Sequence, residues 1–225
     1  MTGTIVNTVT VIVGSSVGLL IGARFSEKIR SIVMHALGLS TLLIGFRMAF
    51  RSESILLVIG SLALGGIIGE LLKIEESLEK LGEFLKRKVK SRSGNFVLGF
   101  VTSSLVFCIG PMTIVGSIQD GVSGDASVLY AKSLLDGFAS VVFASSLGIG
   151  VIFSSLIVLI FQGSLTLLGG RLSFLLRPEI LDELIATGGL IIVGIGIYLL
   201  GIKRIKVGNF LPALVVAVVL ALLFK

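Results

Sequence analysis

The chain has 225 residues, of which 54% are hydrophobic and 14% are charged, and its mean hydropathy is +1.10. This composition excludes an ordinary soluble globular domain and is typical of a polytopic membrane protein. The net charge of +6 reflects Lys and Arg in cytoplasmic loops, so no nucleic-acid partner is predicted. One cysteine, Cys108, excludes an intrachain disulfide, and one histidine, His35, leaves no His/Cys metal cluster, so neither a metal nor a cofactor is expected.

The first third of the chain predicts three membrane spans, because each apolar run is about 18 residues long or more. The first, Thr4–Gly22, is expected to be a retained span and not a signal peptide. Asn7 is a polar group near its start. The second and third spans are Ile32–Phe50 and Ile55–Leu72. Glycines spaced by four residues along the first span predict a smooth groove for another helix, and they are Gly14, Gly18 and Gly22.

Residues 73–92 form the one long polar segment. Apolar residues recur in it every three to four positions, which predicts an amphipathic helix. It carries seven Lys/Arg and four Glu, with the basic residues crowded toward 86–88. Such a helix is expected to lie along the anionic cytoplasmic surface of the membrane.

Residues 95–149 form a central segment with helix breakers and charges at membrane depth. A fourth span begins near Asn95 and is broken at Gly110–Pro111, because proline removes a backbone donor and clashes with the preceding turn. Residues 122–125 are predicted as a turn, and a further helix runs from Ala126 to about Gly148. On this helix Lys132 and Asp136 are four residues apart, so they share a face and can pair.

Polar groups in hydrocarbon are expensive, so those in and around this segment are the candidate lining of a substrate or ion pathway. A broken helix can bind anions at its N-terminal half and cations at its freed carbonyls. The opposing interpretation is an ordinary external loop carrying Asp120 and Asp125 and a structural Lys132–Asp136 pair. The candidate pathway residues are Asn7, Gly110, Pro111, Ser117, Gln119, Asp120, Asp125, Lys132, Asp136 and Gln162.

The last third predicts three more spans, at about Gly150–Gly169, Leu184–Leu200 and Phe210–Phe224, with a loop over residues 170–183. Residues 3–22 align without gaps to 150–169, which predicts an internal repeat. The expected fold is an all-α membrane protein of about eight transmembrane helices, alternatively seven. Spans 1–3 and 6–8 would form an inverted repeat around the central broken-helix pair. The predicted organisation is one polytopic domain over residues 1–225, with parts at 3–72, 73–92, 95–149 and 150–225.

Several stretches resemble the domain-of-unknown-function 554 family, the YqgA-like integral membrane proteins. They are Cys108–Gly121, Lys132–Gly137, Phe143–Gly150, Gly188–Gly196 and Val207–Ala213. The resemblance covers essentially the whole chain and implies a cell-membrane protein of this architecture. Because the family has no assigned activity, it carries over no catalytic residue.

The favoured function is a transporter or channel for a small solute or ion, working as a homo-oligomer, with a dimer favoured. Two alternatives stay open: a non-transporting membrane module that docks a partner through the 73–92 helix, and an intramembrane enzyme acting on a lipid or isoprenoid phosphate. No recognisable catalytic constellation is present, so an enzyme is not expected. The chain is placed in the cell membrane as a multi-pass protein, with its amino terminus outside and residues 73–92 cytoplasmic.

Overall fold

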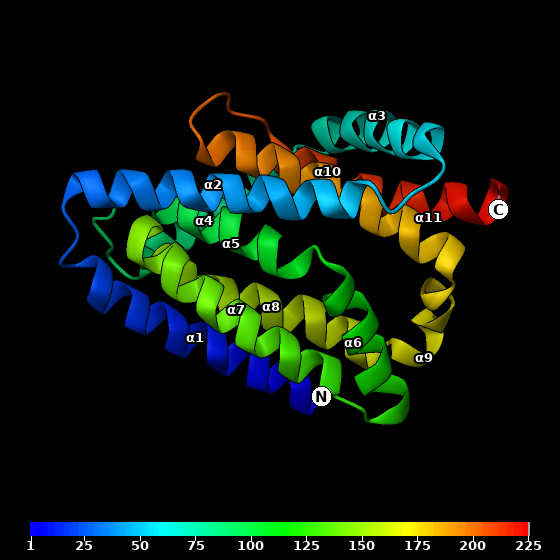
Figure 1. Ribbon diagram of the computed structural model, residues 1–225, viewed down its shortest axis with the longest axis horizontal. Helices are drawn as coiled ribbons and strands as arrows, with labels where there is room; N and C mark the ends of the chain where they lie inside the picture. Colours follow the sequence, from blue (N-terminus) through cyan, green and yellow to red (C-terminus); the bar gives the residue numbers. More distant parts are fainter. Residues whose placement is uncertain (225) are drawn as a thin grey trace. The chain divides into compact units, whose positions relative to one another are not determined.

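A computed structural model describes residues 1–224, and these residues form helices and no strands (Figure 1). The α-helices are α1 (Thr2–Gly22), α2 (Glu27–Ala49), α3 (Ile55–Leu71), α4 (Ile74–Lys88), α5 (Phe96–Cys108), α6 (Pro111–Ser123), α7 (Ser127–Leu147), α8 (Gly150–Leu167), α9 (Gly169–Leu172), α10 (Pro178–Leu199) and α11 (Pro212–Phe224). Two short 3-10 helices, η1 (Ser173–Leu176) and η2 (Val207–Phe210), precede α10 and α11. The all-helical prediction is confirmed.

Among residues 1–224, six helices are long and apolar enough to cross a membrane: α1, α2, α7, α8, α10 and the segment Val207–Phe224. Two bent pairs raise the number to as many as eight, α3 with α4 at 55° and α5 with α6 at 61°. Large apolar side chains remain exposed on these helices, including Leu56 at 84% and Phe138 at 75%. Such a surface belongs in lipid, because soluble proteins rarely expose contiguous apolar patches of this kind.

Two expected loops are partly helical. The predicted loop 170–183 contains the end of α9, all of η1 and the start of α10. Helix α10 begins at Pro178 because proline has no amide proton to lose in a first turn and its φ angle suits a helix. Helix α6 extends to Ser123, inside the predicted turn 122–125, and ends where Gly124 adopts a left-handed conformation with φ 73°.

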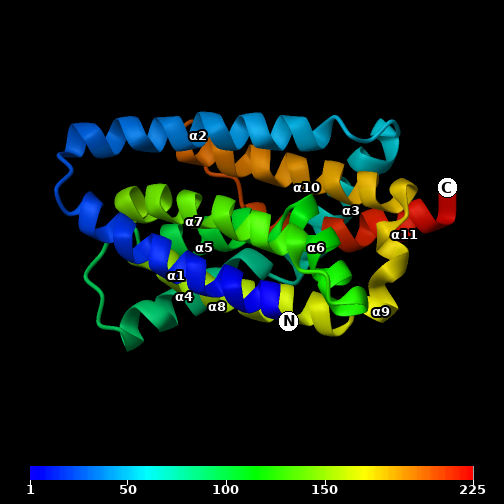
Figure 2. The same cartoon turned by 60° about the horizontal axis from the view of Figure 1, so that its bottom comes forward.

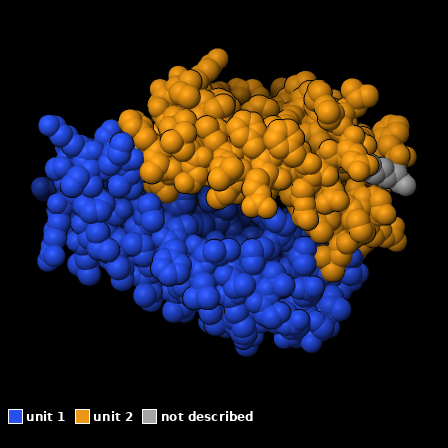
Figure 3. Space-filling view, in the orientation of Figure 1, with its two compact units in different colours: residues 1–34, 79–173 blue, residues 35–78, 174–225 orange. Residues whose placement is uncertain are grey.

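The chain divides into two compact units, shown in Figure 3. Unit 1 comprises residues 1–34 and 79–173, and unit 2 comprises residues 35–78 and 174–225. Each unit therefore combines an early part of the chain with a later part. The predicted inverted repeat and the single-domain organisation stay predictions.

In unit 1, α1, α7 and α8 run side by side (Figures 1 and 2). Helix α1 is parallel to α7: a Cβ atom at Gly3 would meet Leu129, and one at Gly22 would lie 2.3 Å from the Ser145 carbonyl oxygen. A Cβ at Gly18 would likewise lie 2.3 Å from the carbonyl oxygen of Val141. The predicted glycine groove of α1 is confirmed, and α7 fills it.

Helix α8 returns antiparallel to α7 after Gly148, whose φ of 84° suits glycine. The start of α5 packs beside this turn, since a Cβ at Gly99 would touch Leu147. Unit 1 thus has two distinct ends. The Gly148 end holds the α7–α8 turn and the start of α5, and the Met1 end holds the starts of α1 and α7 and the ends of α6 and α8.

Unit 2 is held by close helix pairs of the same kind. Helices α2 and α10 cross at Gly45 and Gly189, where an added Cβ at Gly45 would lie 2.8 Å from the Gly189 carbonyl oxygen. Helices α3 and α11 are equally close, because a Cβ at Gly65 would lie 2.3 Å from the Ala213 backbone. In both pairs glycine allows the backbones to approach, as in other helix pairs in lipid.

Candidate functional site

The centre of the candidate site is a buried ion pair on α7. Lys132 and Asp136 are one helical turn apart, and the Lys132 ammonium contacts Asp136 Oδ2. The two residues are 5% and 8% exposed. Asp136 lies near the middle of α7, so the pair is inside a span and not at its end. The predicted pairing of these two side chains is confirmed.

Two side chains from other helices complete the environment of Asp136. Asn7 on α1 donates from Nδ2 to Asp136 Oδ2 at 2.9 Å and to Gln162 Oε1 on α8 at 2.9 Å. Asn7 and Gln162 are both fully buried. The sequence prediction included these two residues only as isolated polar groups in separate spans. The fold brings them to the same place as the ion pair.

Two threonines extend this network toward the Met1 end. Gln162 Nε2 donates to Thr4 Oγ1 at 3.3 Å, and the Thr4 and Thr166 hydroxyl oxygens are 3.2 Å apart. Sequence reasoning missed both threonines. Threonine hydroxyls in a span often bond to their own helix, as Thr166 does to the Gln162 carbonyl oxygen, so the residue type alone gives no signal.

We call these six residues the polar cluster: Thr4, Asn7, Lys132, Asp136, Gln162 and Thr166. They come from the three adjacent helices α1, α7 and α8 of unit 1. Within the cluster one acceptor remains open, because buried Asn7 Oδ1 has no hydrogen-bond partner. A buried acceptor without a donor is costly, so this oxygen is available to a further ligand.

The predicted helix break lies between α5 and α6. Gly110 is extended and precedes Pro111, which is the first residue of α6. Pro111 has no amide proton to donate to the carbonyl of Phe107, four residues earlier. The Thr113 hydroxyl takes this place and donates to the Phe107 carbonyl oxygen at 3.0 Å. The predicted break is confirmed, and its backbone is repaired by a side chain.

Helix α6 carries Ser117, Gln119 and Asp120 toward the Met1 end. Ser117 is fully buried, and its hydroxyl has no hydrogen-bond partner. Asp120 is 5% exposed, and its Oδ2 lies 3.0 Å from the amino nitrogen of Met1. The Gln119 side chain is half-buried. These three residues lie on a helix that packs against α7 and α8.

Asp125 lies outside the polar cluster, in the exposed turn between α6 and α7. Its Oδ1 accepts the backbone N–H of Ser127 at 3.0 Å. Hydrogen bonds from the Ser127 backbone and side chain hold the pKa of Asp125 below its usual range. This geometry is typical of an acidic residue that closes a turn at the start of a helix.

The described residues include no group of three or more His, Cys, Asp or Glu side chains that could hold a metal ion. Asp136 is the single carboxylate of the polar cluster. Apart from Lys132, the other residues of the cluster are neutral. The cluster therefore lacks the several carboxylates that tight Ca²⁺ sites use and the thiolate and imidazole ligands of zinc.

Two relatives match this chain over nearly its whole length. The uncharacterised membrane protein YdfK of Bacillus subtilis (strain 168) is 32% identical over 220 residues, which are 96% of this chain and 93% of YdfK. The uncharacterised protein YqgA of Escherichia coli (strain K12) is 31% identical over 224 residues, 97% of this chain and 95% of YqgA. No solved structure matches. The model of the protein family of unknown function DUF554 matches residues 2–222, and the chain therefore belongs to the DUF554 family of membrane proteins.

Proposed function

We propose that this membrane protein is a transporter or channel for a small ion or solute, and that a small cation at the polar cluster is the species it handles. The observation that carries the proposal is the buried Lys132–Asp136 pair, held by Asn7 from another helix. Ionisable residues inside spans are rare and generally mark ion or proton pathways, because keeping them in a low-dielectric interior is costly.

A cation fits the chemistry of the cluster. Asp136, Asn7 and Gln162 supply carboxylate and amide oxygens, and the Thr4 and Thr166 hydroxyls add two more. The Lys132 ammonium already fills the place of a cation beside Asp136. A small cation that displaces it would gain Asp136 and the open Asn7 Oδ1 as ligands. With one carboxylate, the site suits weak and reversible binding, which transport requires.

The α5–α6 break supports a pathway beside this cluster. Helix α6 begins at the break and packs against α7 and α8, which carry Lys132, Asp136 and Gln162. Irregular backbone at membrane depth is tolerated where protein or a water-filled cavity satisfies it. Three other predicted pathway residues, Ser117, Gln119 and Asp120, lie on α6, and we propose that they form the approach to the cluster from the Met1 end.

The test is cation flux into liposomes that contain the full chain. The panel is H⁺, Na⁺, K⁺ and Rb⁺, with a pH-sensitive dye and radioactive tracers as readouts. We expect flux of at least one cation, and a reduction of at least about tenfold in Asp136→Asn, because the carboxylate charge is lost. Asp125→Asn, outside the cluster, is the matched control and should retain flux. Absence of flux across the panel, or equal flux in Asp136→Asn, would refute the proposal.

We propose the predicted topology for the cell membrane, with the amino terminus outside and residues 73–92 cytoplasmic. Three basic residues, Arg24, Lys28 and Arg30, follow α1 at the Gly148 end of unit 1, and basic residues 86–92 precede α5 at the same end. A cytoplasmic Gly148 end obeys the positive-inside tendency. Single cysteines at positions 91 and 125, in a Cys108→Ala background, should then label from opposite sides of intact cells.

We also propose that the protein forms a homodimer, which light scattering in detergent can test. Docking of a partner by residues 73–92 is the second candidate function, and it is favoured by α4, which places Lys86, Arg87 and Lys88 in its last turn. Deletion of this helix would distinguish docking from transport, because docking requires the helix and flux through the polar cluster does not. An intramembrane phosphate enzyme fits less well, since Lys132 is engaged by Asp136 and not free as a phosphate clamp.

A further inference from the structure

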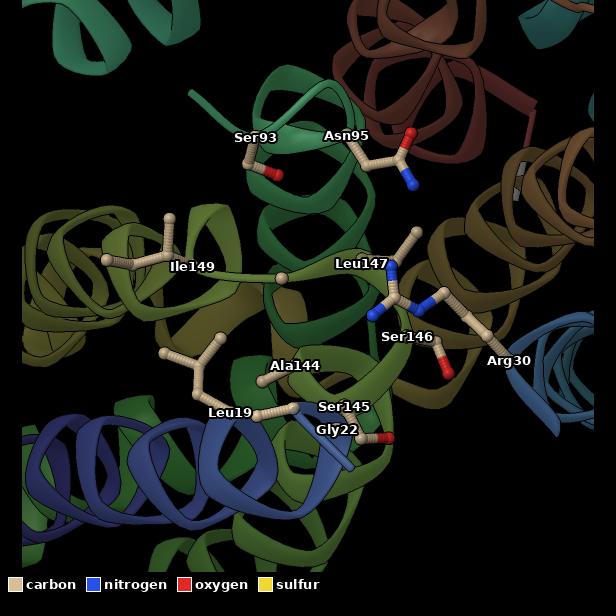
Figure 4. Close-up of a pocket in the computed structure, with 12 residues that line it drawn as sticks. Leu19, Gly22, Arg30, Ser93, Asn95, Ala144, Ser145, Ser146, Leu147 and Ile149 are labelled. Atoms are coloured by element: carbon tan, nitrogen blue, oxygen red, sulfur yellow. The ribbon is translucent and has the colours of Figure 1, made fainter. Parts of the chain in front are cut away.

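A pocket with a volume of about 320 Å³ lies at the Gly148 end of unit 1, away from the polar cluster. That is roughly ten times the volume that a water molecule occupies in the liquid. Its polar lining comes from Arg30, Ser93, Asn95, Ser145 and Ser146, and none of its twelve lining residues carries a carboxylate. In Figure 4 the Arg30 side chain extends from α2 toward the α7–α8 turn, with Ser93 and Asn95 above its guanidinium group.

Arg30 lacks a strong partner in the structure. Its nearest carboxylate oxygen belongs to Glu27 at 3.9 Å, and the Glu27 side chain is 91% exposed. Such a solvent-exposed pair contributes little. The Arg30 Nε atom is buried and has no hydrogen-bond partner. The guanidinium therefore brings an unsatisfied donor and a positive charge to the pocket.

A second unsatisfied group lies on α7. The Ser146 side chain lines the pocket, is 2% exposed, and its hydroxyl has no hydrogen-bond partner. Buried hydroxyl groups almost always find a partner in the protein or in a bound molecule. Ser146 and Arg30 come from different helices and leave donors open at the same pocket, which points to a missing acceptor.

The N-terminus of helix α5 adds to the positive potential. Helix α5 begins beside the pocket without a side-chain cap from Asn95, so its first backbone N–H groups are open. The start of α8 adds little, because the Val151 and Ile152 N–H groups already donate to the carbonyl oxygens of Gly148 and Ile149. Open amides at a helix start favour an anion. Gly148 keeps the space clear, because a Cβ there would lie 3.2 Å from the Ser93 hydroxyl oxygen.

We infer that this pocket binds a phosphate group. Arg30 is its charged anchor, and the Ser146 hydroxyl and the first backbone amides of α5 are further donors. Guanidinium, hydroxyl and helix-start amides are the donors that proteins use for phosphate oxygens. The pocket lies at the ends of the apolar helices α1, α7 and α8, where a phospholipid headgroup would be found. A lipid phosphate and free inorganic phosphate present the same chemistry, and the experiment separates them.

The test measures stabilisation of the full chain in a neutral maltoside detergent. Cys108 is the only cysteine and is buried, so a thiol-reactive fluorescent dye reports unfolding when heat exposes it. The probes are inorganic phosphate, with chloride at the same ionic strength as reference, and dihexanoyl phosphatidic acid, with a dihexanoyl glycerol as reference. The variants are Arg30→Gln and Ser146→Ala. Arg24→Gln, at an exposed arginine just before α2 that does not line the pocket, is the control.

We expect a concentration-dependent rise in unfolding temperature for the wild type and Arg24→Gln. The apparent Kd should be at least about tenfold weaker in Arg30→Gln and more mildly weakened in Ser146→Ala, because the charged hydrogen bond is the stronger. Stabilisation by the lipid alone identifies a headgroup site, and stabilisation by both probes identifies a general phosphate site. Stabilisation by neither probe, or an unchanged Kd in Arg30→Gln, overturns the proposal. None of these outcomes depends on cation flux.

Discussion

The buried ion pair of unit 1 and the buried carboxylates of unit 2 occupy different parts of their helices. In unit 1, Lys132 and Asp136 lie inside α7, and side chains from α1 and α8 surround them. In unit 2, Glu75 and Glu183 lie in the first two turns of α4 and α10. Glu75 Oε2 accepts the Gly208 backbone N–H at 2.7 Å. Glu183 accepts the Ser52 hydroxyl, also at 2.7 Å.

This difference separates a structural role from a functional one. A carboxylate near a helix start interacts favourably with the helix dipole. Glu75 and Glu183 also accept hydrogen bonds from the Gly208 amide and the Ser52 hydroxyl, so they stabilise the fold. In the middle of a span no free amides exist, and a buried ion pair is often no more stable than apolar residues of similar volume. These hydrogen bonds give the unit 2 carboxylates a stabilising role in the fold. The unit 1 pair is the one that the proposed function requires.

The largest expected effect comes from Lys132→Met. This change leaves Asp136 buried without its counter-charge, and we expect the free energy of unfolding to fall by about 3–5 kcal/mol. The double variant Lys132→Met/Asp136→Leu removes both charges and should recover most of that loss while abolishing cation flux. Thiol-dye unfolding through Cys108 measures the stability of all three proteins.

These two variants test whether the ion pair is needed for folding. A double variant as unstable as Lys132→Met would mean that the pair is needed for folding. Unit 1 and unit 2 would then use buried charges in the same way.

The second prediction concerns the unit 2 junction. Glu75→Leu leaves the buried Gly208 amide without an acceptor, and Asn209 Oδ1 still receives the N–H of residue 75. We expect a loss of about 2 kcal/mol in unfolding free energy, typical of a hydrogen bond to a charged group. Flux per folded molecule should be unchanged. Glu76→Gln, on the next residue of α4, is the control. Reduced flux from correctly folded Glu75→Leu would contradict the structural assignment.

The third prediction tests a structural polar contact that lies inside a span. Thr113→Val removes the hydroxyl that replaces the missing Pro111 amide, so the Phe107 carbonyl loses its partner. We expect a loss of about 1 kcal/mol, and Thr113→Ser should restore it. Thermal unfolding of both variants in detergent measures the difference. Equal stability of the Val and Ser variants would show that the hydroxyl does not repair the break.

The sequence predicts much of this fold for clear physical reasons. Apolar runs of span length, the glycine spacing of α1 and the break at Pro111 each follow from local chemistry, and the structure contains all three. The groove on α1 is visible in the sequence, but its occupant is not. Only the folded chain shows that α7 fills it, because helix pairing in lipid depends on shape and not on pattern.

The candidate site shows the same contrast: single residues stand out in the sequence, but the packing of the helices brings them together. Asn7 and Gln162 stand out as polar residues in separate spans, but their meeting depends on how α1 and α8 pack. Glu183 escapes notice because it falls in an expected loop, although Pro178 signals an earlier helix start. Arg30 and Ser146 give no sequence signal at all, since a basic loop residue and a serine in an apolar helix are both ordinary.

The smallest effect is expected at Asp125, a carboxylate that the sequence places with Asp136 but that lies at a helix start like Glu75. Its pKa is lowered from 3.8 by hydrogen bonds from Ser127, so its contribution to stability is present above pH 3.8 and is lost as the pH falls through the lower, folded-state pKa. In Asp125→Ala this dependence should disappear, while stability and cation flux at pH 7 should barely change, because Asp125 is exposed. Circular dichroism melts between pH 7 and pH 3 measure the first effect, with Asp125→Asn as the uncharged control. A loss of flux in Asp125→Ala at pH 7 would place this turn on the pathway. The distinction between carboxylates inside spans and carboxylates at helix starts would then fail within unit 1 itself.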